Sequence, residues 1–547
     1  MSAFRNPHIE PIQNSHNWQK ILLITLVLLA GLSLRLCALG NIFLWNDETD
    51  NFDEQIFGHM STSLRRYAAL ESQELTLGPA WSLIIALTCR VFGGVVTVGR
   101  MPSVLFGTAA ILCIFYLVYR LVQPNDDESF FAPALVAAVL ATVSIIQMEF
   151  SQRIIPYGAV PFLTAAIIIA HLKIVHLIQK KLLPIDKLII WCILYTLVAG
   201  FSVYLHLSVT MILFASFIML FRTAFRLPDI DKDRKIVVFG LLALTSLAVS
   251  LAWIGNVIHT QSGYRFYLAP YYHPLNLGAI PFLLSRAYDL LTYNLNLFYN
   301  GALYWPRRLN PVLLPLILMC VVGWFYSAMG RFGWPAKHLS LFGTITILLT
   351  ALLSLLERYP FGGVRQTLFM SPFIYTFTAL GFWALMRSRF GKVIAGATAI
   401  GYLVLWGINL PHFYKERVSP YTAQDLVSVW EEHGKCGFYG DGGCGDTIRY
   451  VLRDYPEIEV QNLDYEHEVL PEPPFFLISP HWSMEDSLWL PQLRERIEEL
   501  GYHIELIMAR SAAYPVLPEC RQSLYSPANG LWLYKITKGI KNLEKMQ

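Results

Sequence analysis

Apolar runs of near-membrane-spanning length recur from Ile21 to Leu410 and then stop. A helix of about 20 apolar residues crosses the hydrocarbon core of a bilayer with its backbone hydrogen bonds satisfied internally. Hydrophobic residues make up 55% of the 547 residues and charged residues only 15%, against about 25% charged in a soluble domain. The pattern predicts an α-helical polytopic membrane domain over residues 1–418 and a small soluble α/β domain over residues 419–547.

Eleven of the apolar runs are predicted to span the membrane. They are Ile21–Leu39, Met101–Val122, Phe131–Gln147, Pro156–Ile178, Leu188–Tyr204, Leu207–Phe221, Ile236–Ile258, Pro311–Met329, Leu339–Leu356, Thr367–Met386 and Val393–Leu410. The first run contains Arg35 and lacks a small-residue cleavage site, so we expect a retained helix rather than a signal peptide. A further segment, Pro79–Val91, is short for a span and carries Arg90 at its end.

Lysine and arginine gather in four loops, and these loops decide the topology. The clusters are Lys173/Lys180/Lys181/Lys187, Arg222/Arg226/Lys232/Arg234/Lys235, Arg331/Lys337 and Arg387/Arg389/Lys392. All four fall on the side of the N-terminus only if Pro79–Val91 does not cross. We therefore predict an interfacial helix at Pro79–Val91, a cytoplasmic N-terminus and an extracytoplasmic C-terminal domain, in the cytoplasmic (inner) membrane of the cell. The net charge of +3 is small and spread out, so no nucleic-acid partner is expected.

An acidic cluster, Asn46–Asp50 (NDETD), follows the first span on the predicted outer side, within the outer loop 41–100. Other polar segments share that side: Met148–Ile155, the turn at His206, His259–Asn310 and Glu357–Gln366. Ionisable groups at a membrane boundary indicate a functional site, since charges are costly there without a role. The alternative for the acidic cluster is a solvated interfacial loop.

The soluble tail alternates helix and strand patterns. Expected helices are Thr422–Glu432, Asp446–Tyr455 and Met484–Leu500, and expected strands are Gly437–Gly440, Phe475–Ser479, His503–Ala509 and Leu531–Ile536. The segment 440–443 lacks the glycine spacing of a dinucleotide-binding loop, so binding or orienting a partner is favoured over catalysis. Cys436 and Cys444 flank a Gly-rich turn and are predicted to form a disulfide, with Cys520 as the competing thiol.

Four segments resemble those of the GT-C glycosyltransferases, in the branch of the protein O-mannosyltransferases and the lipid A aminoarabinose transferases. A carboxylate pair, Asp47-Glu48, follows the first span. Arg100–Gly107 (RMPSVLFG) resembles the family's R-x-P-S-x-x-F-G segment, and Phe150–Tyr157 (FSQRIIPY) its Y-S-Q-x-x-R-P-Y segment. Tyr359–Gln366 (YPFGGVRQ) is similar to a late outer loop that carries an arginine.

The resemblance implies a membrane glycosyltransferase that takes a sugar from a polyprenyl-phosphate carrier and gives it to a glycan, lipid or protein acceptor. Asp47 is then the general base, and Glu48 orients Asp47, an outer cation or a metal. Arg153 and Arg365 bind the carrier phosphate with Tyr157 as hydroxyl donor, while lipid-headgroup contact is the alternative for each arginine. His206 and Tyr359 are further candidates for the site.

Two points stay open at the level of sequence. Asp47, Glu48 and Asp50 offer oxygen ligands to a divalent metal, Mg²⁺ or Mn²⁺, but three ligands are fewer than either ion takes. The alternative function is a transporter or flippase of a lipid-linked sugar, which would use the same arginines without a base at Asp47. Transporters often have paired repeats with broken helices, and the sequence displays neither.

Overall fold

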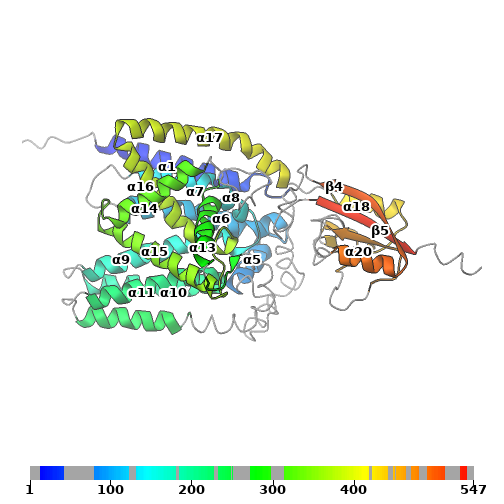
Figure 1. The fold of residues 1–547 in the computed structure, drawn as a ribbon, viewed down its shortest axis with the longest axis horizontal. Helices are drawn as coiled ribbons and strands as arrows, with labels where there is room; N and C mark the ends of the chain where they lie inside the picture. The colour runs from blue at the N-terminus through cyan, green and yellow to red at the C-terminus, as the bar shows by residue number, and fades with distance from the viewer. Residues whose placement is uncertain are drawn as a thin grey trace, which may run out of the picture.

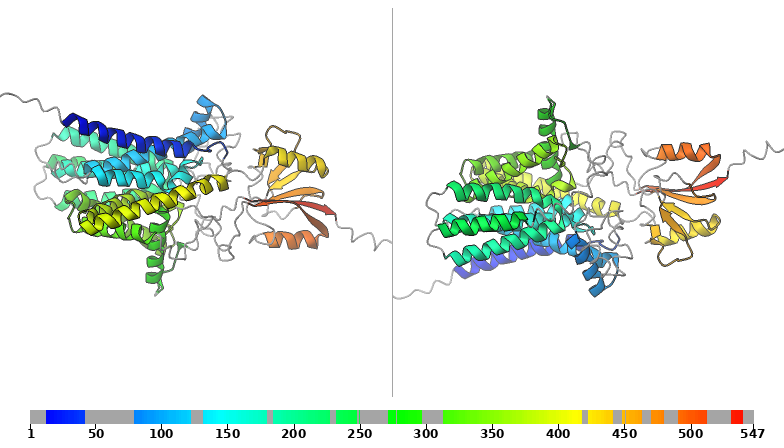
Figure 2. Two further views of the ribbon diagram at one scale, coloured as in Figure 1. Left: turned by 90° about the horizontal axis from the view of Figure 1, so that it is seen from above. Right: turned by 90° about the horizontal axis from the view of Figure 1, so that it is seen from below.

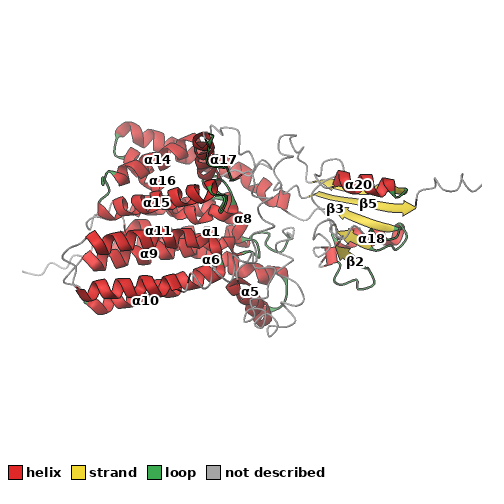
Figure 3. Ribbon diagram, turned by 60° about the horizontal axis from the view of Figure 1, so that its bottom comes forward, coloured by secondary structure: helices red, strands yellow, loops and turns green. Residues whose placement is uncertain are grey.

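The computed structural model describes residues 13–41, 79–121, 131–179, 184–226, 232–247, 249, 271–276, 278–296, 313–417, 422–440, 448–449, 451–462, 470–479, 490–511 and 530–538. A long helical bundle is followed along the chain by a small α/β unit (Figure 1). Figure 3 separates the two by secondary structure: the strands all belong to the C-terminal unit. Asp47, Glu48 and Asp50 lie outside the described residues.

The bundle consists of long helices that run back and forth between its two ends (Figures 1 and 2). They are α1 (Gln13–Leu36), α6 (Val96–Tyr116, continued by the π-helical turn η2, Leu117–Leu121), α7 (Phe131–Val143), α8 (Ile145–Ser151), α9 (Val160–Gln179), α10 (Ile185–Leu205), α11 (Thr210–Arg226), a helix over 232–247, α14 (Leu314–Ala328), α15 (Trp334–Leu355), α16 (Ser371–Met386) and α17 (Arg389–Arg417). Within the described residues, each predicted span overlaps at least one of these helices.

Eight helices of the described residues are long and apolar enough to cross a membrane, or nine if the bent pair α7–α8 forms one span. That pair is bent by 58° at Ser144. α14 is apolar but shorter, with 15 residues. The predicted span Ile236–Ile258 is described only as far as 247, with residue 249 beyond it.

Close helix contacts in the bundle depend on small residues, because in lipid the hydrophobic effect drives no helix association and close van der Waals packing does. α14 and α16 approach most closely at Gly323 and Gly381. A Cβ at Gly323 would overlap the Phe377 carbonyl oxygen, and a Cβ at Gly381 would overlap that of Met319. Both positions therefore require glycine for space, and a larger residue at either would separate the two helices.

Two shorter helices lie across the bundle rather than along it (Figure 2). They are α5 (Pro79–Phe92) and α13 (Ala279–Asn294). Both occur toward the end of the bundle where α1 and α17 finish and where the α/β unit follows. We call this the α/β-facing end. The orientation of α5 agrees with the interfacial helix predicted at Pro79–Val91.

The α/β unit is a five-stranded sheet in the order β2-β1-β3-β5-β4. Its strands are β1 (Phe438–Gly440), β2 (Val460–Asn462), β3 (Phe475–Ser479), β4 (Tyr502–Ser511) and β5 (Gly530–Lys538). β1 pairs in parallel with β2 and β3, whereas β5 is antiparallel to β3 and β4. Helices α18 (Ala423–Glu432) and α20 (Leu490–Glu499) cover opposite faces (Figure 2).

The sequence explains both faces of this sheet. Thr422 and Asp425 form a capping box that starts α18, and Leu426 packs with Phe438 and Phe476 on one face. Ile497 of α20 packs with Phe475 on the other. Alternate residues of β3 thus serve two cores, as a strand buried on both faces requires.

The predicted disulfide of Cys436 is wrong for this structure. Cys436 is a free, buried thiol whose Sγ lies 3.5 Å from the Gly434 carbonyl oxygen, and it packs in the core beneath α18. Cys444 and Cys520 lie outside the described residues. The small thiol fills apolar space there, which is the commonest role of a buried cysteine.

Candidate functional site

Three spans begin with a short 3₁₀ turn at the α/β-facing end, and these turns contact one another. They are η4 (Pro156–Gly158) before α9, η5 (Leu207–Val209) before α11 and η7 (Arg365–Met370) before α16. Helix N-termini present unpaired backbone N–H groups and the positive end of the helix dipole. Four of the predicted site residues lie in or beside these turns: Tyr157, His206, Tyr359 and Arg365.

The turn that carries Tyr157 is fixed by two neighbouring helices. The Trp81 indole Nε1 of α5 donates to the Ile154 carbonyl at 3.3 Å, and the Ser103 hydroxyl of α6 donates to the Ile155 carbonyl at 3.3 Å. Tyr157 itself is buried, and its ring lies 5.5 Å from that of Phe150. The backbone just before Pro156 is therefore held by α5 and α6, and this fixes the start of the turn that carries the phenol.

His206 ends α10 and caps η5 with its own side chain. The Ser208 backbone N–H donates to Nδ1 at 3.1 Å, and the Ser208 hydroxyl lies 2.6 Å from the same nitrogen. Burial, with a smaller effect of the Arg365 guanidinium, lowers the pKa of His206 to about 3. The ring is thus neutral at physiological pH, and because Nδ1 accepts, its proton resides on Nε2.

Arg365 is the first residue of η7, and it lies against Tyr157. Its Cζ is 5.1 Å from the Tyr157 ring centroid, and the Tyr157 and His206 rings are 4.5 Å apart. Three side chains from three different turns are thereby in contact, with the Tyr157 and His206 rings tilted by 58° to each other. A guanidinium on an aromatic face gains about 0.5–2 kcal/mol from the ring quadrupole, which holds Arg365 without using all of its donors.

Tyr359 completes this group from the loop between α15 and η7. Its hydroxyl donates to the Gln366 carbonyl at 2.7 Å. Burial, together with the neighbouring Tyr157, raises the pKa of Tyr359 well above its ordinary value, and this outweighs the hydrogen bond with Ser208. Tyr359 is accordingly a neutral hydroxyl that fixes the start of η7. We call Tyr157, His206, Tyr359 and Arg365 the turn cluster.

Arg153, the other arginine predicted to bind the carrier phosphate, lies in a buried ion pair. Its Nε lies 2.9 Å from Glu149 Oε1, and both side chains are almost fully buried. Its carbonyl accepts from the Ser103 hydroxyl. The pair neutralises the arginine within the segment that joins α8 to α9. The role of Arg153 as a ligand of the carrier phosphate stays a prediction, while Arg365 is the cation of the turn cluster.

Metal binding has no support among the residues that the structure describes, where no three His, Cys, Asp or Glu side chains are grouped as ligands. The proposed ligands Asp47, Glu48 and Asp50 lie outside that part of the chain.

Ser208 is the site residue that sequence reasoning missed. It bonds His206 through both its N–H and its hydroxyl. The signal for it was local: a serine two residues after a histidine at a helix start can form such a side-chain turn.

A buried polar chain near the same end links three other elements. The Gln147 amide donates to the Ser371 hydroxyl at 3.0 Å, and that hydroxyl donates to Asn294 Oδ1 at 2.6 Å. The Tyr375 hydroxyl donates to the Asn294 carbonyl at 3.1 Å. These bonds attach the last turn of α13 to α8 and α16.

The spanning helices, the interfacial helices and the appended α/β unit together define a GT-C-like fold. An oligosaccharyltransferase of Archaeoglobus fulgidus in its apo form is similar over 90% of this chain and 70% of its own, with a TM-score of 0.52 at 12% identity. ArnT from Cupriavidus metallidurans in its apo state is similar over 85% of this chain and 93% of its own, with a TM-score of 0.50 at 11% identity. No protein-family model and no curated protein matches the chain. The resemblance to GT-C enzymes in the sequence is therefore confirmed for the fold.

Proposed function

We propose that this protein is a membrane glycosyltransferase that moves a sugar from a polyprenyl-phosphate carrier to an acceptor on the outer face of the cytoplasmic membrane. One observation carries the proposal: three helix N-termini meet at one end of the bundle, with Arg365 among them. Converging positive dipole ends and a guanidinium form a site for an anion. A carrier lipid with its tail in the bilayer would bring its phosphate to that level.

The turn cluster fits a phosphate that leaves a sugar. The leaving oxygen gains negative charge in the transition state, so preset donors around it lower the barrier. Arg365 supplies a fixed positive charge, and the neutral His206 supplies an Nε2–H donor. Tyr157 supplies a hydroxyl beside both. None of these groups needs to change its protonation state to hold the phosphate.

The acceptor hydroxyl must lose a proton as it attacks the anomeric carbon, and Asp47 is the proposed general base. The end of α1 supports this role. The Gln152 amide donates to the Arg35 and Cys37 carbonyls at 2.9 Å each, and Arg100 donates to the Leu39 carbonyl at 2.8 Å. The last described residue after α1, Asn41, therefore lies at the α/β-facing end. Six further residues to Asp47 span at most about 21 Å.

The carrier class has one further line of support. ArnT of Cupriavidus metallidurans, whose apo structure has a similar fold, has also been solved bound to undecaprenyl phosphate. Glu48 is proposed to orient Asp47. The acceptor is a glycan, a lipid or a protein, and the α/β unit is proposed to bind or orient it.

The test is transfer by the purified full-length chain in lipid nanodiscs. Radiolabelled undecaprenyl-phosphate sugars are supplied with a membrane extract as the source of acceptors. Transfer of label to an extract component, lost on Asp47→Asn, is the expected result. A protein that carries labelled lipid across vesicle membranes without transferring its sugar would be a flippase instead, and the proposal would then be wrong.

A further inference from the structure

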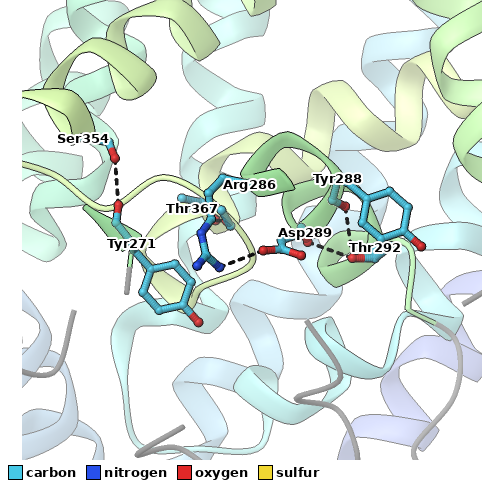
Figure 4. Close-up of polar contacts among 8 residues, drawn as sticks. Tyr271, Arg286, Tyr288, Asp289, Thr292, Ser354 and Thr367 are labelled. Carbon is cyan, nitrogen blue, oxygen red and sulfur yellow. Dashed lines mark hydrogen bonds and ion pairs between the residues drawn. The ribbon is translucent and has the colours of Figure 1, made fainter. Parts of the chain in front are cut away.

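One side of the loop that carries Arg365 packs against α13 and the segment before it (Figure 4). The Ser354 hydroxyl, at the end of α15, donates to the Tyr271 carbonyl at 2.7 Å. The Phe361 N–H donates to the same carbonyl at 3.4 Å. The segment at Tyr271 therefore contacts both the end of α15 and the middle of this loop.

Two glycines bring the loop into direct contact with α13. A Cβ at Gly362 would lie 3.0 Å from Arg286 Cδ and 3.3 Å from the Tyr271 ring, and Gly362 has a φ of +138°. A Cβ at Gly363 would lie 2.7 Å from the Asp289 carbonyl oxygen. Side chains at either position would push the loop off the helix. The backbone at Gly362 and Gly363, three and two residues before Arg365, thus packs directly against Arg286 and Asp289.

Arg286 is itself held by an ion pair and by aromatic rings. Its Nη1 lies 2.8 Å from Asp289 Oδ2, with side-chain exposures of 12% and 3%. The guanidinium is 4.9 Å from the Tyr271 ring centroid and 5.5 Å from that of Phe282. Within the described part of the chain its Nε is buried without a hydrogen bond. The position of the Arg286 side chain is therefore set by the Asp289 carboxylate and by the Tyr271 and Phe282 rings, not by a full set of hydrogen bonds.

A buried ion pair is weak support for stability, because desolvation offsets much of the attraction. Because the ion pair lies where Gly362 packs against α13, we infer that it fixes the position of the loop. The Thr367 hydroxyl donates to the Gly362 carbonyl at 2.7 Å. This hydrogen bond closes the turn from Gly362 to Thr367, which contains Arg365. The same turn contacts Arg286 through Gly362.

We propose that Arg286 and Asp289 are positioning residues that set Arg365 on the Tyr157 ring and thereby set the affinity for the carrier phosphate. This inference rests on the proposed function. Asp289 holds Arg286, Arg286 supports Gly362, and the closed turn places Arg365. Neither residue of the pair needs to touch the carrier.

A double-mutant cycle with full-length protein in nanodiscs tests the proposal, with sugar-free undecaprenyl phosphate as the ligand. Asp289→Asn removes the charge and keeps the shape, so Arg286 loses its anchor. We expect a roughly 5- to 20-fold loss of affinity, with the maximal transfer rate within about threefold of the parent. In an Arg365→Ala background the same substitution should change affinity by less than about twofold, because the residue through which it acts is absent.

Each other outcome contradicts the inference. An equal loss in both backgrounds would mean that Asp289 acts independently of Arg365. No loss for Asp289→Asn, with a clear loss for Arg365→Ala, would overturn the inference and leave the proposed function intact. No loss for Arg365→Ala would overturn both.

Two further variants serve as a replacement and as a control in this test. Arg286→Lys keeps the positive charge but loses the planar stack on Tyr271, and it runs through the same cycle if Asp289→Asn does not fold. Glu498→Gln removes the carboxylate of an exposed ion pair with Arg494, at 2.9 Å, on α20. This control should bind undecaprenyl phosphate within twofold of the parent, since a general effect of charge would alter it as well.

Discussion

Arg365 lies over the ring of Tyr157, with 5.1 Å between Cζ and the ring centroid. The two residues are more than 200 positions apart in the chain, and each begins a different span. The contact therefore forms only when α9 and α16 pack with their N-terminal ends side by side. It defines the turn cluster as a tertiary feature, and it places a permanent cation where three helix N-termini meet.

Replacing Arg365 tests the anion site directly. Arg365→Ala should weaken binding of undecaprenyl phosphate by about 10- to 100-fold, the loss expected when a charge-assisted contact is removed. Arg365→Lys should be intermediate, since an ammonium keeps the charge but not the stack. Equilibrium binding in nanodiscs measures both. Arg331→Ala is the control, because that exposed arginine precedes α15 and is separated by the length of this helix from the loop that carries Arg365. A loss there as large as for Arg365 would contradict the site.

Asp47→Asn separates the two candidate functions. Asn is close in shape to Asp but cannot take a proton at neutral pH, and removal of a general base costs about 10²–10⁴-fold in rate. We expect single-turnover transfer to fall by that amount while undecaprenyl-phosphate affinity stays within about threefold. A flippase would have the opposite ranking, with Arg365 critical and Asp47 dispensable. Transfer within threefold of the parent would exclude Asp47 as the base.

His206 should make the free energy of unfolding depend on pH in the acid range. Its pKa is about 3 in the folded protein against about 6.5 in an unfolded chain. Above pH 6.5 both states are neutral and stability is complete. As pH falls from 6.5 toward 3 the unfolded state binds a proton that the folded state excludes, so the free energy of unfolding falls by at most ~1.4 kcal/mol per pH unit.

His206→Asn should reduce that acid sensitivity, because Asn Oδ1 can replace Nδ1 as the acceptor for Ser208 without titrating. The measurement is the change in Tm between pH 7.5 and pH 5 in detergent. His503→Asn serves as control, since His503 is exposed in the α/β unit. An unchanged acid shift for His206→Asn would mean that His206 does not remain neutral on folding.

Much of the fold could be predicted from sequence because the spans have a strong and local signal. Apolar length alone located the long spanning helices, and charge in the loops identified Pro79–Val91 as a helix lying across the bundle. In the tail, Phe475–Ser479 was predicted with its observed bounds. β2 was missed because a three-residue strand, Val460–Asn462, carries no usable periodicity.

The site was less accessible to sequence reasoning. α13 lies within the aromatic segment predicted as an outer loop, where its tyrosines and Pro281 obscure the helical pattern. The pairing of Glu149 with Arg153 follows from their four-residue spacing and was available from sequence. The meeting of Tyr157, His206 and Arg365 was not, because it depends on the packing of three spans whose relative level no local pattern encodes.

The remaining prediction concerns which side of the membrane holds the turn cluster. The positive loops lie at the far end of the bundle, and positive charge favours the cytoplasm; the α/β-facing end is then outside. In a background without native cysteines, Gln424→Cys on α18 and Ser72→Cys in the loop 41–100 should react with a membrane-impermeant maleimide in intact cells. Ser388→Cys, exposed between α16 and α17, should react only after lysis. If Ser72 labels from outside while Gln424 labels only after lysis, Pro79–Val91 crosses the membrane. The α/β unit would then lie in the cytoplasm, and the turn cluster could not act on an acceptor at the outer face.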